Sequence, residues 1–183
     1  MHHRLLPFAA LLLLAPLVSQ SQEKTENPFK SAKIGDYVAY KLTTSVMGKD
    51  IDVNVKQTVT AQDEKEATLK TTTAFMGIDL PAQITKIDLT KPYDITAAAT
   101  QGAEKGKFEK TGEGKEKVKV GDKTYDCNWL TGKVVAEAMG QKLESEVKVW
   151  FSKAVPLTGL VKLDMKSNLA NVKMEIAESG SAK

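Results

Sequence analysis

The sequence is nearly devoid of two residue types that carry much of enzyme chemistry. Both histidines (His2 and His3) and the single arginine (Arg4) lie at its extreme N-terminus, and Cys127 is its one cysteine. Without imidazole there is no Ser-His-Asp or Cys-His arrangement and no zinc site of the usual Cys/His type. Without arginine there is no bidentate clamp for phosphate or carboxylate. We therefore predict a non-enzymatic protein with no catalytic residue, no metal and no cofactor.

The first residues have the pattern of an export signal. Arg4 precedes an apolar run over residues 5–18, and Ser19 and Ser21 then stand at the small-x-small spacing of a cleavage site. The run is shorter than the roughly 20 residues that span a bilayer. We expect residues 1–21 to be a signal peptide. The mature protein is then periplasmic or extracellular, and not integral to the membrane.

Removal of this segment leaves a chain with little net charge. Of the 26 basic residues only Arg4 is lost, so 25 lysines face 23 acidic residues. A balance this close to neutral gives no strong attraction to nucleic acid or to an anionic surface. We expect no nucleic-acid partner.

Most of the remaining sequence alternates between apolar and polar residues. This period of two is typical of half-buried antiparallel strands, and valine and threonine, which favour strands, dominate it. Pro81 and Pro92 restrict the segment between them to edge or broken strands, because proline cannot donate to a ladder. The alternation is clearest over residues 36–46, 51–59, 69–75, 117–164 and 172–176.

These patterns predict an all-β, mainly antiparallel fold: a strongly curved sheet or an open half β-barrel, with room for one short helix. The apolar residues are more than one flat layer can bury, so the sheet must curve or be covered. We expect a flexible leader at 22–33, a single domain at 34–178 and a disordered tail at 179–183. Residues 100–117 are mainly lysine, glutamate and glycine, which predicts a mobile loop within the domain.

One partial match to a calcium loop fails. Asp50, Asp52 and Asn54 have its opening spacing, but Val55 replaces the glycine needed for the turn and Ala61 replaces the closing acid.

Four aromatic residues are the candidate ligand-binding residues: Tyr125, Trp129, Trp150 and Phe151. They could line a pocket for an apolar ligand or fill a core, and for Trp150 packing is favoured. Cys127 has two interpretations as well. An odd cysteine in an exported chain can form an intermolecular disulfide or be a reactive thiol, but it can also be a small buried hydrophobe, which we favour here.

A resemblance rests on residues 121–162. They contain G-D-K-T-Y-D-C (121–127), a V-W-x-S strand (149–152) and V-P-L-x-G-L-V-K (155–162). This pattern resembles small uncharacterised bacterial secreted and envelope β-proteins and, more distantly, the half-barrel fold of outer-membrane lipoprotein carriers. The resemblance implies a lipid or another apolar ligand held in a concave sheet. The alternative is a structural or protein-interaction module of the cell envelope that binds a protein partner and no small molecule.

Overall fold

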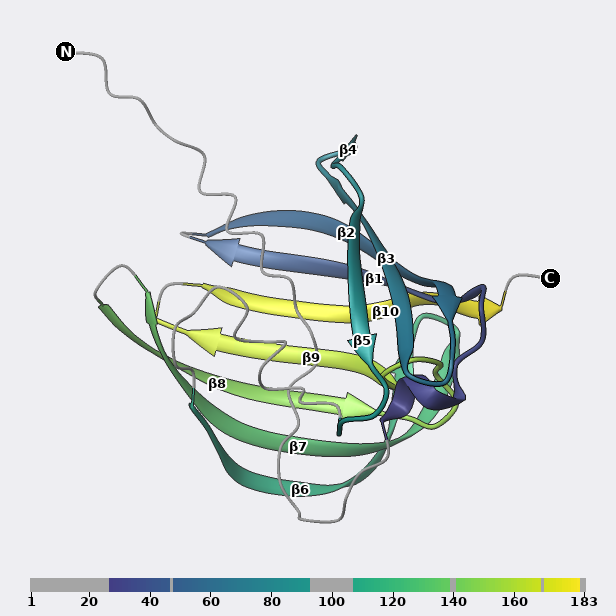
Figure 1. Cartoon of the computed structure of the whole chain (residues 1–183). Helices are drawn as coiled ribbons and strands as arrows, with labels where there is room; N and C mark the ends of the chain where they lie inside the picture. Colours follow the sequence, from purple (N-terminus) through teal and green to yellow (C-terminus); the bar gives the residue numbers. More distant parts are fainter. Residues whose placement is uncertain (1–26, 47, 93–106, 139–140, 169, 182–183) are drawn as a thin grey trace.

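The chain forms a single antiparallel sheet that curves strongly and does not close (Figure 1). The structure, a computed structural model, describes residues 27–46, 48–92, 107–138, 141–168 and 170–181. The predicted signal peptide lies outside them. Along the sheet the strand order is β4-β3-β2-β1-β10-β9-β8-β7-β6, and β5 also pairs with β3.

Two meanders meet in the middle of this sheet. The first contains β1 (Asp36–Val46), β2 (Lys49–Gln62), β3 (Glu66–Phe75), β4 (Ile78–Asp79) and β5 (Gln83–Asp88). The second contains β6 (Lys107–Val120), β7 (Lys123–Ala138), β8 (Gln141–Phe151), β9 (Leu160–Ser167) and β10 (Asn171–Ser181). The first and last strands, β1 and β10, pair antiparallel from Asp36 opposite Ser181 to Ser45 opposite Asn171 and so join the meanders.

The strand register gives the sheet one apolar face and one polar face. On the apolar face, one row of paired residues is apolar across seven strands: Phe75, Val53, Leu42, Met174, Leu163, Val149 and Leu130. The adjacent row on the polar face is Asn54, Lys41, Glu175, Lys162, Trp150, Trp129 and Gly114. The alternation in the sequence therefore corresponds to two distinct surfaces.

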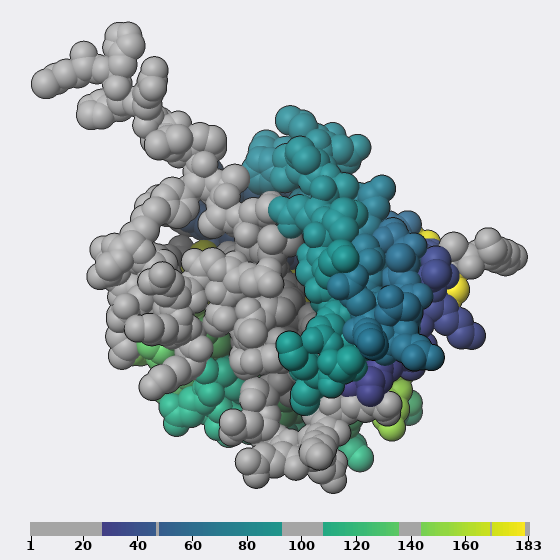
Figure 2. Space-filling model, in the orientation of Figure 1, coloured from purple at the N-terminus to yellow at the C-terminus, as the bar shows by residue number. Residues whose placement is uncertain are grey.

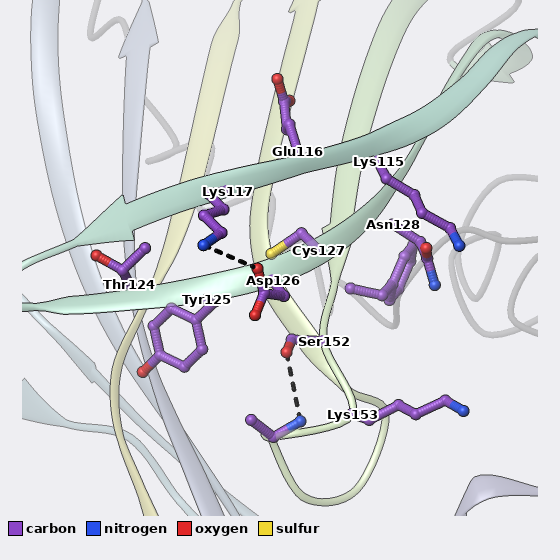
Figure 3. Close-up of a pocket in the computed structure, with 12 residues that line it drawn as sticks. Lys115, Glu116, Lys117, Thr124, Tyr125, Asp126, Cys127, Asn128, Ser152 and Lys153 are labelled. Atoms are coloured by element: carbon purple, nitrogen blue, oxygen red, sulfur yellow. Dashed lines mark hydrogen bonds and ion pairs between the residues drawn. The ribbon is translucent and has the colours of Figure 1, made fainter.

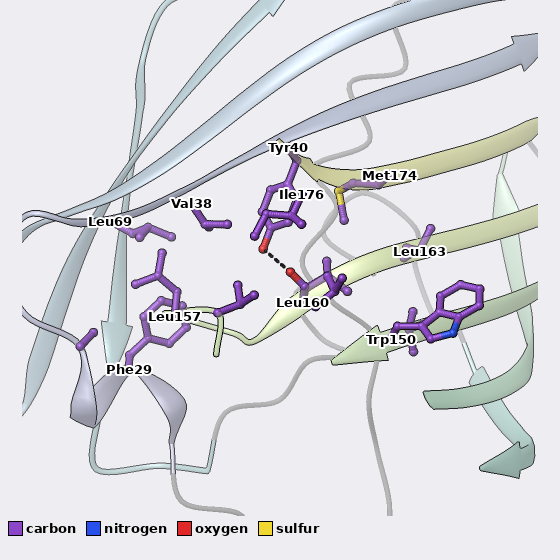
Figure 4. Close-up of a cluster of buried hydrophobic side chains, with 14 of the residues drawn as sticks. Phe29, Val38, Tyr40, Leu69, Trp150, Leu157, Leu160, Leu163, Met174 and Ile176 are labelled. Carbon is purple, nitrogen blue, oxygen red and sulfur yellow. Dashed lines mark hydrogen bonds between the residues drawn. The ribbon is translucent and has the colours of Figure 1, made fainter. Parts of the chain in front are cut away.

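A short 3-10 helix, η1 (Pro28–Ser31), and residues 152–159 pack on one end of the apolar face. Phe29 of η1 is 1% exposed, and Leu157 is buried in the same cluster as Val38 and Leu69. Figure 4 shows these four side chains well apart from Leu163 and Met174. In the space-filling view β2–β5 form one wall of the molecule, with η1 residues in purple against its edge (Figure 2).

Asn27 holds η1 in place. Its buried side chain accepts a hydrogen bond from the Phe29 amide and donates to the carbonyls of Asp88 and Lys91, at 3.1 and 3.2 Å. A polar side chain in this position satisfies the helix start and also ties it to the end of β5.

The structure confirms the predicted fold class and corrects three boundaries. Residues 107–117 of the expected loop are part of β6, while 100–106 lie outside the described residues. An edge strand needs only one partner, and its charged residues can remain in solvent. The expected tail is a strand as far as Ser181, because it pairs with the start of β1. The leader is ordered from Asn27 onward, because Phe29 is buried.

Candidate functional site

Trp129 and Trp150 are direct cross-strand partners on the polar face of β7 and β8. The Trp129 indole lies over Gly114 of β6, where a Cβ atom would be only 2.6 Å from its Cζ2 atom. A glycine in a strand interior often marks such a close approach. Trp150 is 7% exposed. The two indoles therefore pack against the sheet as cross-strand neighbours, on the face opposite the apolar row.

A lysine and a glutamate complete this tryptophan cluster. The Lys148 ammonium lies 4.6 Å from the ring centroids of both Trp129 and Trp150. Glu116 accepts a hydrogen bond from Lys148 at 2.9 Å and another from the Trp150 indole nitrogen. Lys148 and Trp150 together lower the pKa of the Glu116 carboxyl. The cluster thus satisfies its own polar groups, as a polar cluster packed against a sheet requires.

Tyr125 and Phe151 lie elsewhere, at a pocket where β8 ends (Figure 3). This strand-end pocket has a volume of about 640 Å³ and is bordered by β6, by residues 124–128 of β7 and by residues 151–154. Tyr125 is half-buried on the face of β7 that carries Trp129, whereas Phe151 lies on the apolar face opposite Leu160. Lys115, Lys117 and Lys153 also border the pocket.

Cys127 is free and 3% exposed, which agrees with the interpretation that it is a small buried hydrophobe. Burial raises the pKa of its thiol, and the nearby carboxylates of Asp126 and Glu116 raise it further. Both effects disfavour the thiolate, which is the reactive form.

The four candidate residues therefore fall into two pairs, and only Phe151 lies on the apolar face. Binding of a ligand by any of them stays a prediction. Lys148 lies two residues from Trp150 on β8, so the alternation of a strand puts both side chains on one face. Sequence reasoning missed Glu116 and Gly114, because only the pairing of β6 with β7 brings them to the tryptophans.

The margin of the apolar face is a second candidate site, because the middle of the row is buried. Val53, Leu130 and Met165 are half-buried and pack at the margin of the core. Among the described residues no group of three or more His, Cys, Asp or Glu side chains could hold a metal ion. In the same part of the chain, no helix has the length and apolar character needed to cross a membrane.

Together these features define a class: a strongly curved, unclosed antiparallel sheet with one continuous apolar face. No family model matches the sequence, and no curated protein matches it.

Solved structures share the fold. A candidate exported protein with a YmcC-like fold from Bacteroides fragilis is similar at a TM-score of 0.55 and 10% identity, covering 81% of this chain and 97% of its own. A candidate lipoprotein from Parabacteroides distasonis gives 0.53 and 10%, covering 81% and 96%. A LolA-superfamily protein from Nitrosomonas europaea aligns over 86% of this chain at a TM-score of 0.26, too low to support an argument. The likeness to exported β-proteins is confirmed for the fold alone.

Proposed function

We propose that this protein is an exported, non-enzymatic envelope protein that binds a lipid or another apolar ligand on the apolar face of its curved sheet. The observation that carries this proposal is the apolar row that crosses seven strands from Phe75 on β3 to Leu130 on β7. A concave, mainly apolar surface is the usual form of a site for small apolar ligands.

The packing of the core supports this location. Phe29 and Leu157 are at one end of the apolar face (Figure 4), and the middle of the row, including Leu163 and Met174, is 0–5% exposed. Toward the margin, Val53 and Leu130 are only half-buried. Removing apolar surface from water contributes about 25 cal/mol per Å². An acyl chain bound against this half-buried margin would therefore gain affinity without any polar contact.

The test is native mass spectrometry of protein purified from its own envelope fraction, followed by solvent extraction. We expect a bound mass that is released as lipid. An apo mass in every charge state, with nothing in the extract, would contradict the proposal and favour a protein partner.

A matched pair of variants locates the ligand. Val53→Lys introduces a charge on the apolar face, whereas Asn54→Lys introduces the same charge on the next residue, which faces the other side. We expect Val53→Lys to reduce the bound mass at least tenfold and Asn54→Lys to leave it unchanged. Thermal melts of both variants confirm that they are folded. Equal loss of ligand in the two variants would place the ligand elsewhere.

A further inference from the structure

Strand β7 extends beyond its neighbour β8 at one end. It pairs with β6 as far as Lys123, but its pairing with β8 stops at Asn128, opposite Phe151. Residues 123–127 therefore have a strand partner on one side only. At Ser152 the chain turns away, and the Ser152 amide donates to the Gly159 carbonyl at 2.8 Å.

The turn before β7 determines which backbone groups face this open edge. Gly121 and Asp122 form a two-residue loop in which Gly121 has a φ of 57°, as in a type II′ turn. In such a hairpin the flanking residues, Val120 and Lys123, exchange hydrogen bonds, and the bonded pairs then alternate. The N–H and C=O groups of Thr124 and Asp126 therefore point away from β6. No backbone hydrogen bond joins either residue to a described residue outside the sheet ladders.

The strand-end pocket lies beside these groups. It is lined by residues 124–128 of β7 and by the turn from Ser152 to Ala154 (Figure 3). Its volume of about 640 Å³ lies within the range of roughly 300–1,000 Å³ for sites that hold small ligands. Space thus exists where β8 would continue if the chain did not turn.

The open edge of β7 also carries fewer lysines than β6, the outer edge of the sheet. Exposed edge strands usually carry charged residues, lysine above all, that discourage pairing with another chain. The neighbouring strand β6 carries Lys115, Lys117 and Lys119. The open segment of β7, residues 123–127, reads K-T-Y-D-C and has one lysine, at its start. An added strand would therefore meet only two charged residues of this edge, Lys123 and Asp126.

We propose that the edge at Thr124–Asp126 binds an extended peptide segment of a partner protein as an added strand. Main-chain hydrogen bonds to Thr124 and Asp126 would supply affinity, and alternate side chains would supply specificity. Residues paired with Tyr125 and Cys127 would pack against the Tyr125 ring, which favours apolar side chains.

The intervening residues of the peptide would face the lysines that border the pocket. Lys115 and Lys117 lie on the same face of the hairpin as Asp126, and Lys153 is on the facing turn. Lys117 is 3.9 Å from Asp126, but Lys115 and Lys153 form no ion pair with another described residue. The residue between the two apolar ones would lie directly opposite Asp126, where a like charge is destabilising, so a neutral polar residue is favoured there. The excess of positive charge favours acidic residues at the positions outside the two apolar ones. The proposal does not depend on a ligand at the apolar face.

The probe is a capped heptapeptide, Thr-Glu-Val-Thr-Val-Glu-Thr, which places a neutral residue opposite Asp126. The same peptide N-methylated at alternate amides is its control. Titration is followed by calorimetry and by amide hydrogen exchange of the full mature protein. Thr124→Pro removes an outward N–H that β6 does not use, which is the kind of position where a strand tolerates proline. Thr124→Ala, the matched variant, keeps that N–H.

We expect binding that slows exchange at Thr124 and Asp126, a dissociation constant at least tenfold higher for Thr124→Pro, and a change under twofold for Thr124→Ala. N-methylation should weaken binding equally, and this comparison holds even if the proline variant does not fold. Equal affinity for both peptides, or no binding at millimolar concentration, would overturn the proposal. A dimer of the wild-type protein that Thr124→Pro dissociates would also overturn it, since the occupant would then be a second copy.

Discussion

Replacing Gly114 with alanine tests the packing of the tryptophan cluster. The new methyl group would lie 2.6 Å from Cζ2 and 2.8 Å from Cε2 of Trp129, closer than carbon atoms can approach. The backbone of β6 is held by its ladder with β7, so the indole must move. When it moves, Lys148 loses one of the two rings that flank its ammonium group.

The expected cost follows from three contributions. Overpacking of a well-packed site costs about 1–3 kcal/mol, and the loss of a partly exposed cation–π contact adds about 0.5–1 kcal/mol. Alanine also lowers the entropy of the unfolded chain, which offsets about 0.4–1 kcal/mol. The net loss is about 2 kcal/mol. For a domain of this size it lowers the melting temperature by about 4–8 °C.

Urea and thermal unfolding, followed by circular dichroism, measure this loss. Gly112→Ala is the matched control, because its methyl group would lie 3.5 Å from the Trp129 ring, an ordinary contact, and 2.9 Å from the Thr131 hydroxyl oxygen, so it should leave the indole in place and cost less. Trp129→Leu removes the clashing ring, so in that background Gly114→Ala should cost less than about 0.5 kcal/mol. The same cost in both backgrounds would refute the clash as its cause.

Three further predictions concern other residues. In a urea titration, Asn27→Ala should lower the free energy of unfolding by about 2–3 kcal/mol, because it leaves buried backbone groups unpaired. The control Ser31→Ala removes an exposed hydroxyl and should change the free energy of unfolding by less than about 0.5 kcal/mol. Cys127 should react with iodoacetamide at pH 8 at least tenfold more slowly in the folded protein than in urea, and similar rates would contradict its burial. Hydrogen bonds from Thr90 and Lys91 lower the pKa of Asp88 to about 2. Because this pKa is depressed in the folded state, the stabilisation is present above about pH 4 and is lost as the pH falls toward 2. The stability difference between wild type and Asp88→Asn should therefore shrink over that interval, and a constant difference would rule out this carboxylate as its source.

The strands could be predicted because their signal is local. Val38, Tyr40 and Leu42 alternate along β1, and all three are buried as the pattern requires. The strand at 107–117 was missed for the opposite reason. Its composition is that of a mobile loop, and its order comes from one neighbour, β7, whose register no local pattern contains.

The candidate site shows the same division. The sequence identified both tryptophans as candidate ligand-binding residues, and the alternation of a strand accounts for Lys148 on the same face as Trp150. It could not show that Trp129 lies opposite Trp150, nor that Glu116, 34 residues earlier, reaches the Trp150 indole. Those contacts depend on the β6–β7 and β7–β8 registers taken together. The division between an apolar and a polar face likewise becomes visible only in the whole sheet.

The pairing of β1 with β10 makes the fold a circularly permuted up-and-down meander. The two strands at the centre of the sheet are neighbours in space but lie at opposite ends of the strand order along the chain. Apart from that seam, each strand pairs with a neighbour close in sequence, and Asp36 lies opposite Ser181 at one end of the seam. If a short linker joined β10 to β1 and the chain were opened between β5 and β6, the order β6 to β10 followed by β1 to β5 would pair almost entirely in sequence. Folding rates rise as contacts become more local. In the native order the central ladder is instead the most long-range pairing of the sheet, since it joins residues 36–45 to residues 171–181.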